Sequence, residues 1–213
     1  MIYLYITRHG MTKWNEEGRL QGHGDSALTL QGQKDAKALS KVMKDYPIDT
    51  IYSSPLSRAY DTACLIFPNR KIIKDERLKE MGFGDYEGRY ISELIELKDY
   101  DDLWNHPENF NRIHNGESYE EVIMRLQSFL DELRSLKEEH HIFITIHGML
   151  YVVLMSIIKN IPKKDLVTLN RNIIRGGSLT IVSLENGQYQ IISEVIDDHL
   201  EKVKTISYTK NRG

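Results

Sequence analysis

The almost wholly apolar run Ile-Phe-Ile-Thr-Ile at residues 142–146, which ends at His147, most constrains the fold of this chain. A strand with one exposed face alternates apolar and polar residues, whereas a strand covered on both faces is apolar nearly throughout. The apolar residues at 149–158 are too few to span a bilayer and are typical of a buried helix. This pattern predicts a central strand with helices on both faces of its sheet.

Strand-like and helix-like segments alternate along most of the chain, as they do in α/β proteins. Strand patterns occupy residues 2–8, 49–54, 71–74 and 142–147, and helix patterns occupy residues 29–45, 55–67, 118–139 and 149–158. The pair Asn186-Gly187 between two alternating runs predicts a terminal hairpin. We expect a single domain over 1–213, a three-layer α/β/α sandwich with a mostly parallel central sheet, helices on both faces and a small helical cap.

Start signals support two of the predicted helices. Thr29 precedes the first apolar positions of residues 29–45 and is a candidate N-cap. Ser118 and Glu121 have the spacing of a capping box at the start of residues 118–139.

Residues 89–116 interrupt the alternation, because they are charged and aromatic without clear periodicity. We expect a helical excursion over one edge of the sheet, acting as a cap or lid. Tyr86, Trp104 and Phe110 are candidates to wall a pocket beneath it, with ordinary packing as the alternative.

Composition excludes several kinds of site and partner. The 213 residues carry a net charge of −3 with neutral histidines, which argues against general nucleic-acid binding. Cys64 is the only cysteine, so neither an internal disulfide nor a thiolate zinc site is expected. No segment resembles an export signal or a membrane span, so we expect a cytoplasmic protein without a membrane partner. The oligomeric state stays open, a homodimer included.

Basic side chains follow three of the predicted strands. Arg8 and His9 end the first strand, Arg58 comes shortly after the second, and His147 ends the strand at 142–147. Each residue alone is more often structural than functional. Because reactive side chains of open α/β sheets collect at the carboxyl ends of strands, the set together predicts a shared site. Guanidinium and imidazole groups suit a dianionic phosphoryl group.

Five separated motifs carry a resemblance to one family. They are ITRHGMTKWNEEGRLQGHGDSALTLQGQKDA near the start, then IYSSPLSRAYDTA, LKEMGFGDYEG, Gly116-Glu117-Ser118 and His147-Gly148. In this order they resemble the histidine phosphatase superfamily, the phosphoglycerate-mutase-like enzymes. The resemblance covers nearly the whole chain and implies a phosphatase of the histidine acid phosphatase type.

The resemblance implies a role for each basic residue of the predicted site. His9 is the nucleophile that becomes phosphorylated, and Arg8, Arg58 and His147 bind the phosphoryl oxygens. His9 must attack through a neutral ring nitrogen, so its other nitrogen should donate to a backbone acceptor. His147 is expected to act as an imidazolium beside the two guanidinium groups.

The resemblance also assigns the remaining site residues. Glu80 matches the general acid and base, Asn15 adds a hydrogen bond to the phosphoryl group, and Gln21 and Gly148 contact the substrate. Neither a metal ion nor another cofactor is implied, and the expected partner is a small phosphorylated substrate.

Three functions remain open from the sequence. The short stretch between Glu80 and Glu117 resembles the phosphatase members and favours hydrolysis of a phosphomonoester. A cofactor-dependent phosphoglycerate mutase is the alternative, with Arg89 and Arg112 as candidate contacts to a second acid group. An inactive relative that binds phosphorylated ligands is the least favoured, because the residues of the catalytic set, His9 among them, are present.

Overall fold

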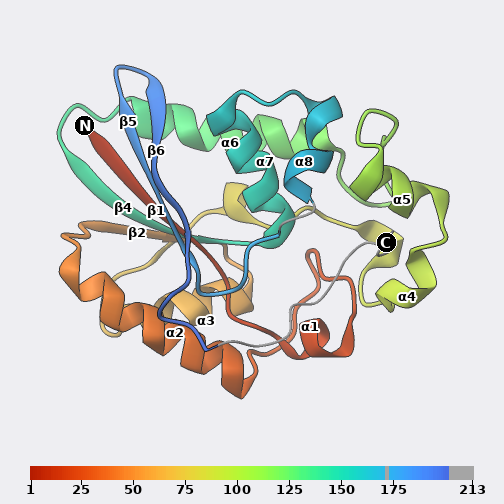
Figure 1. The fold of residues 1–213 in the computed structure, drawn as a ribbon, viewed down its shortest axis with the longest axis horizontal. Coiled ribbons are helices and arrows are strands. Elements are labelled where there is room, and N and C mark those ends of the chain that lie inside the picture. The colour runs from red at the N-terminus through yellow and green to blue at the C-terminus, as the bar shows by residue number, and fades with distance from the viewer. Residues whose placement is uncertain (171–172, 202–213) are drawn as a thin grey trace.

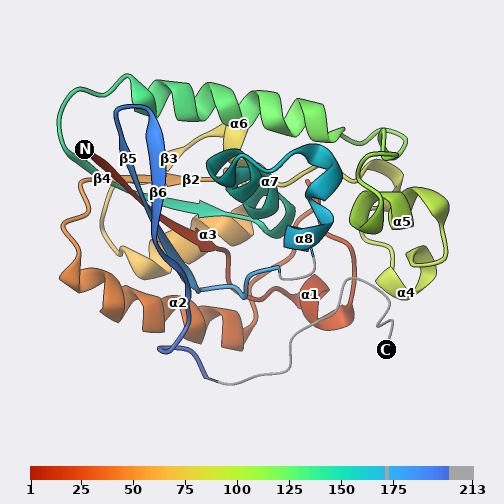
Figure 2. The same cartoon turned by 45° about the horizontal axis from the view of Figure 1, so that its top comes forward.

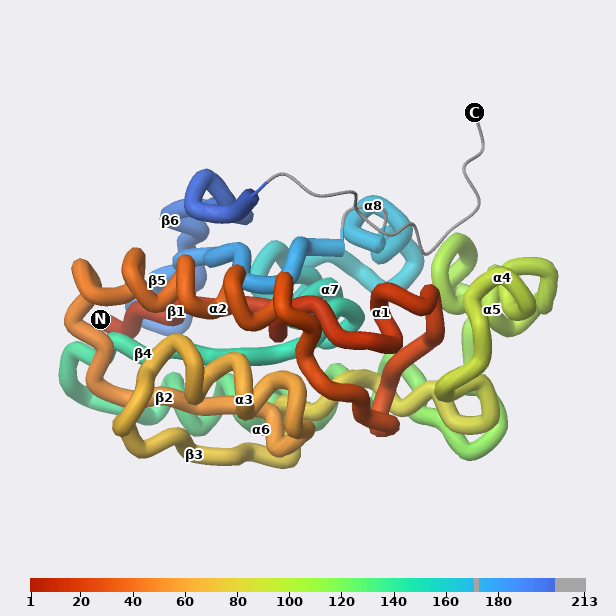
Figure 3. The backbone as a smooth tube through the Cα atoms, turned by 90° about the horizontal axis from the view of Figure 1, so that it is seen from below, coloured from red at the N-terminus to blue at the C-terminus, as the bar shows by residue number. Residues whose placement is uncertain are grey.

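The computed structural model describes residues 1–170 and 173–201, and in these residues one six-stranded sheet has the order β3-β2-β4-β1-β5-β6 (Figure 3). The strands are β1 (Ile2–Arg8), β2 (Thr50–Ser53), β3 (Ile73–Lys74), β4 (His140–Ile146), β5 (Leu179–Glu185) and β6 (Gln188–Ile196). Neighbours among β1 to β4 pair in parallel, whereas β5 is antiparallel to both β1 and β6. The predicted mostly parallel sheet is confirmed.

Helices cover both faces of this sheet, with α2 and α3 on one face and α6 and α7 on the other (Figures 1 and 2). The helices are α1 (Lys13–Glu17), α2 (Leu30–Val42), α3 (Ser57–Ile66), α4 (Ile91–Leu94), α5 (Lys98–Asn105), α6 (Tyr119–Arg134), α7 (Gly148–Lys159) and α8 (Val167–Asn170). Short 3₁₀ turns occupy η1 (Met43–Asp45), η2 (Glu76–Leu78), η3 (Gly84–Tyr86) and η4 (Lys163–Asp165). The three-layer α/β/α architecture is therefore confirmed.

The central strand β4 separates two hydrophobic clusters. Phe143 packs with residues of α2 and α3, whereas Ile142 and Ile144 pack with residues of α6 and α7. Successive side chains of a strand point to opposite faces, so the alternate side chains of an apolar run pack into the two clusters. Both faces are therefore covered, as the run at 142–146 predicted. None of the helices in residues 1–170 and 173–201 is long and apolar enough to cross a membrane.

Both helix start signals are confirmed, but one helix is shorter than predicted. Thr29 accepts a hydrogen bond from Gly32 N at the start of α2, and Ser118 and Glu121 form a reciprocal capping box on α6. Helix α6 ends at Arg134, although the periodicity extends to residue 139. Leu136, the next apolar position, is 37% exposed, so a further turn would bury little apolar surface.

The terminal hairpin turns at the predicted pair. Asn186 and Gly187 both have positive φ, at 51° and 78°. Two consecutive residues with positive φ match the right-handed twist of the flanking strands.

The predicted cap segment contains helices α4 and α5. They lie beyond the carboxyl ends of the strands, at the opposite end of the sheet from the N-terminus (Figures 1 and 3). Its aromatic residues determine this position, because Trp104 and Phe110 are buried in the cluster shared with α6 and α7.

Candidate active site

A small cleft lies beside the carboxyl ends of β1 and β4. The predicted site residues that line it are Arg8, His9, Asn15, Gln21, Glu80 and Gly148. Arg58 and His147, the other two predicted site residues, are buried next to His9. The fold thus brings all the predicted site residues together.

His9 is held as a neutral imidazole of one tautomer. Its Nδ1 is 2.8 Å from the carbonyl oxygen of Gly10, which can only accept, so the proton resides on Nδ1. Nε2 then accepts a hydrogen bond from Arg58 Nε at 3.3 Å. Burial lowers the pKa of His9 well below its usual value, and the charges of Arg58 and Arg8 lower it further. The geometry therefore presents a nitrogen lone pair beside two cations.

Arg58, at the start of α3, is fixed by the loop at residues 22–25. Its Nη1 donates to Gly24 O at 2.9 Å and to Asp25 Oδ1 at 3.0 Å, and its Nη2 donates to Gly22 O at 2.6 Å. The side chain is fully shielded from solvent. A guanidinium held by three partners cannot rotate freely, so Nε stays directed at His9.

Arg8, the last residue of β1, approaches the start of α7. Its Nη1 donates to Ile174 O at 3.0 Å. A Cβ atom at position 148 would lie 3.5 Å from Arg8 Cζ and 3.1 Å from Ile173 Cγ2. Gly148 therefore allows the N-terminus of α7 to come close to this guanidinium group.

His147 lies beside His9, with the two ring centroids 5.1 Å apart. Within the part of the chain that the structure describes, neither ring nitrogen of His147 has a hydrogen-bond partner, and the residue is fully buried. Burial lowers the pKa of His147 well below its usual value, and the charges of Arg58 and Arg8 lower it further. The expected imidazolium therefore requires a nearby anion, such as the phosphoryl group for which it is predicted.

Glu80 is held at the N-terminus of α7. Its Oε1 accepts hydrogen bonds from Met81 N at 2.9 Å and Leu150 N at 2.8 Å, and its Oε2 accepts one from Met149 N at 3.0 Å. First-turn N–H groups of a helix have no partners within the helix, so a carboxylate is well placed there. Glu80 is 5% exposed and lines the cleft.

Asn15 and Gln21 are partly committed to the loop that they shape. Asn15 Oδ1 accepts from Thr12 N in a capping box at the start of α1. Gln21 Oε1 accepts from Thr12 Oγ1 at 2.8 Å, and Gln21 Nε2 donates to Ser26 Oγ at 3.2 Å. The oxygen atoms of both amides are therefore occupied, which leaves N–H groups as the donors that could meet an anion in the cleft.

Five apolar or aromatic residues also line the cleft and were only partly predicted. They are Leu20, Phe83, Trp104, Met149 and Ile173. Of the three aromatic candidates, Trp104 lines the cleft, whereas Phe110 packs edge-on against Tyr119 and Tyr86 lies beneath Arg89. Leu20, Phe83 and Met149 lie within or next to the quoted motifs, which is the signal that could have identified them.

Two charged residues outside the predicted set support the segment that carries Glu80. Arg125 donates to the backbone carbonyl of Glu80 at 3.0 Å and forms an ion pair with Glu117. No sequence pattern links Arg125 to the backbone carbonyls that it contacts. In residues 1–170 and 173–201, no three His, Cys, Asp or Glu side chains are grouped as metal ligands would be.

Comparisons with known proteins agree with this arrangement. A family model for the histidine phosphatase superfamily (branch 1) matches residues 4–197. The probable phosphoglycerate mutase GpmB of Enterobacter sp. (strain 638) is 34% identical over 169 residues, which cover 76% of this chain and 77% of that protein.

Two solved structures are also similar. Bacillus stearothermophilus YhfR is 32% identical with a TM-score of 0.86, over 94% of this chain and 100% of that one. The phosphoserine phosphatase of Entamoeba histolytica, in complex with 3-phosphoglyceric acid, is 26% identical with a TM-score of 0.83, over 94% of this chain and 100% of that one.

Proposed function

This chain belongs to the histidine phosphatase superfamily, and on that premise we propose that it is a metal-independent phosphomonoesterase that acts through a phosphohistidine on His9. Its relatives include a phosphatase and a mutase, so phosphoryl transfer is the activity common to them. The observation that carries the proposal is the state of His9, which is buried and neutral, with its Nδ1 proton directed at Gly10 O and Nε2 facing Arg58.

In the first step, the Nε2 lone pair of His9 attacks phosphorus and the bond from phosphorus to the alcohol oxygen breaks. Once Nε2 is bonded to phosphorus, Arg58 Nε donates to a phosphoryl oxygen in place of the ring nitrogen. The protonated form of Glu80 transfers its proton to the departing oxygen and becomes a carboxylate, so the leaving group departs as an alcohol.

In the second step, water attacks the phosphohistidine. Glu80, now a carboxylate, takes a proton from the water as its oxygen bonds to phosphorus. The N–P bond breaks, its electron pair returns to Nε2, and inorganic phosphate leaves. Arg8 and Arg58 offset the charge on the phosphoryl oxygens throughout, which is the main requirement of such a transfer.

His147 changes its interactions when a phosphoryl group binds. Its two buried nitrogens have no partner within the described residues, and burial together with nearby cations lowers its pKa. A dianion placed beside the ring has the opposite electrostatic effect and favours the protonated form. We expect His147 to become a hydrogen-bond donor to a phosphoryl oxygen only when substrate is bound.

The positions of Arg89 and Arg112 favour the phosphatase over the mutase. Arg89 lies near Glu93 on the surface, with N and O atoms 3.7 Å apart, and Arg112 pairs with Glu121 at 3.1 Å. Neither residue is among the described residues that line the cleft. The two candidate contacts for a second acid group are therefore engaged elsewhere.

We propose a small phosphorylated metabolite as the substrate, because the cleft is small and is lined by apolar side chains as well as by cationic ones. One of the similar solved structures is an enzyme named for phosphoserine, and phosphoserine is one candidate. The cytoplasmic location and the homodimer stay predictions.

A panel of phosphate esters, assayed with EDTA present, tests the proposal. The panel includes phosphoserine and 3-phosphoglycerate, the latter with and without 2,3-bisphosphoglycerate. We expect release of inorganic phosphate from at least one ester and no isomerisation of 3-phosphoglycerate. Isomerisation that depends on the bisphosphate would establish the mutase, and binding of esters without turnover would establish an inactive relative.

A further inference from the structure

The side chain of Arg125 spans the backbone that leads to Glu80. Its Nη1 donates to Arg77 O at 2.7 Å and to Lys79 O at 2.6 Å, and its Nη2 donates to Glu80 O at 3.0 Å. Residues 79 and 80 follow η2 and belong to no helix or strand. One guanidinium group therefore holds a stretch of chain that lacks the repeating backbone hydrogen bonds of regular structure.

Glu117 fixes this guanidinium group from the other side. Its Oε1 accepts from Arg125 Nε at 3.0 Å, and its Oε2 accepts from Arg125 Nη2 at 3.1 Å and from Gly82 N at 2.8 Å. Although burial alone raises it, hydrogen bonds from His23 and Arg125 lower the pKa of Glu117 to about 2. Glu117 is therefore ionised at neutral pH, and a planar bidentate pair of this kind has a defined orientation.

His23 connects the same network to the loop that holds Arg58. Its Nε2 lies 3.0 Å from Glu80 O and 3.5 Å from Glu117 Oε2. His23 stands between Gly22 and Gly24, whose carbonyls accept from Arg58. The backbone carbonyl of Glu80 thus meets two donors, one from α6 and one from the Arg58 loop.

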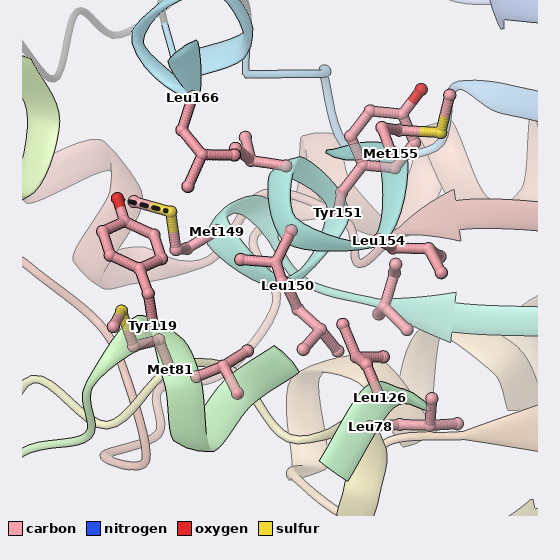
Figure 4. Close-up of a cluster of buried hydrophobic side chains, with 14 of the residues drawn as sticks. Leu78, Met81, Tyr119, Leu126, Met149, Leu150, Tyr151, Leu154, Met155 and Leu166 are labelled. Atoms are coloured by element: carbon pink, nitrogen blue, oxygen red, sulfur yellow. Dashed lines mark hydrogen bonds between the residues drawn. The ribbon is translucent and has the colours of Figure 1, made fainter. Parts of the chain in front are cut away.

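Apolar packing fixes the residues around Glu80. Leu78 and Met81 are fully buried and lie among side chains of α6 and α7, including Leu126 and Leu150 (Figure 4). Leu78 and Met81 are thus anchored in the core, and Arg125 holds the peptide between them. The carboxylate of Glu80 is thereby held at the N-terminus of α7, where it lines the cleft.

We propose that Arg125, oriented by Glu117, is a positioning residue that places the carboxyl group of Glu80 for proton transfer to the leaving oxygen. This inference rests on the proposed phosphatase function and adds the residue that positions its general acid, Glu80. A proton donor displaced by a fraction of an ångström transfers its proton less efficiently, whereas attack by His9 is unaffected.

The two steps can be separated by the leaving group. An aryl phosphate with an acidic phenol, such as p-nitrophenyl phosphate, needs little help from a proton donor, whereas an alkyl phosphate depends on one. The value of kcat/KM for each ester reports the steps up to release of the alcohol. The ratio of kcat/KM for the alkyl ester to kcat/KM for the aryl ester therefore measures the contribution of the general acid.

Arg125→Met and Arg125→Lys are compared with Arg134→Met as a matched control. Arg134 is also in α6, but it pairs with Asp131 on the surface and lies over the ring of Tyr189. We expect Arg125→Met to lower the alkyl-to-aryl ratio by about 10- to 100-fold. Lysine lacks the planar guanidinium group that donates several hydrogen bonds at once, so Arg125→Lys should restore the ratio only in part. The control Arg134→Met should leave the ratio unchanged.

An equal loss on both esters, or an unchanged ratio, would overturn this role for Arg125. If Arg125→Met does not fold, Glu117→Gln and Arg125→Lys decide by the same ratio, with melting temperatures measured alongside. Failure of the proposed function itself would look different, because the unaltered protein would then turn over neither ester.

Discussion

Replacement of Glu80 by glutamine tests the proposed acid and base with almost no change in side-chain volume. The carboxylate accepts three backbone hydrogen bonds, from Met81, Leu150 and Met149. An amide has one oxygen, so the side chain of the Glu80→Gln variant retains at most two of these bonds and turns its NH₂ group toward a remaining N–H. Loss of a hydrogen bond to a charged acceptor lowers the free energy of unfolding by about 1.5–3 kcal/mol. For a chain of this length, the melting temperature should fall by roughly 3–12 °C.

The effect on activity should depend on the leaving group. General acid catalysis contributes roughly 10²–10⁴-fold, so the barrier for an alkyl phosphate should rise by about 3–5 kcal/mol in Glu80→Gln. An aryl phosphate should still phosphorylate His9. Because hydrolysis of the adduct needs Glu80 as a base, the phosphohistidine should then accumulate.

Calorimetry and steady-state kinetics on both esters measure these effects, and a quenched-flow trace of phenol release measures accumulation. A burst of one phenol per active site, followed by slow turnover, is the expected result. An alkyl ester hydrolysed at the unaltered rate, or equal losses on both esters without a burst, would remove Glu80 from this role.

Two further predictions concern the cationic residues. Arg58→Lys should lower kcat/KM for an aryl phosphate by about 10²–10³-fold. A lysine cannot contact Gly22 O, Gly24 O and Asp25 and also donate a hydrogen bond to His9. A loss below about fivefold would contradict the role of the fixed guanidinium group. Burial lowers the pKa of His147 in the folded protein below 6.5, its value in the unfolded chain. The contribution of neutral His147 to stability is therefore present above about pH 6.5 and is lost as the pH falls toward the pKa of the folded state. The melting temperature should therefore fall on acidification and His147→Asn should flatten this dependence, whereas an identical slope in the variant would contradict the buried neutral ring.

Much of the sheet could be predicted because the burial of a strand determines its pattern of apolar and polar residues. The run at 142–146 showed a strand covered on both faces, and Asn186-Gly187 marked a turn that needs positive φ. The cap could not be placed in this way. Its position depends on where Trp104 and Phe110 are buried, and that is a property of the whole core.

The candidate site was foreseeable only as a set of residue types at strand ends. Their convergence follows from the parallel order of β2, β4 and β1, which places residues after each strand at one end of the sheet. The lowered pKa of His147 could not be predicted, because it depends on burial and on the distances to nearby cations. Arg125 was missed for a related reason: its three carbonyl partners share no sequence pattern with it.

Rapid quenching of the protein during turnover of a ³²P-labelled monoester tests the phosphohistidine mechanism most directly. We predict a label that survives alkali, is lost in acid and maps by mass spectrometry to the peptide containing His9. The same label should be missing from His9→Ala under identical conditions. Full activity in His9→Ala, or a label on any other residue of the unaltered protein, would contradict this mechanism.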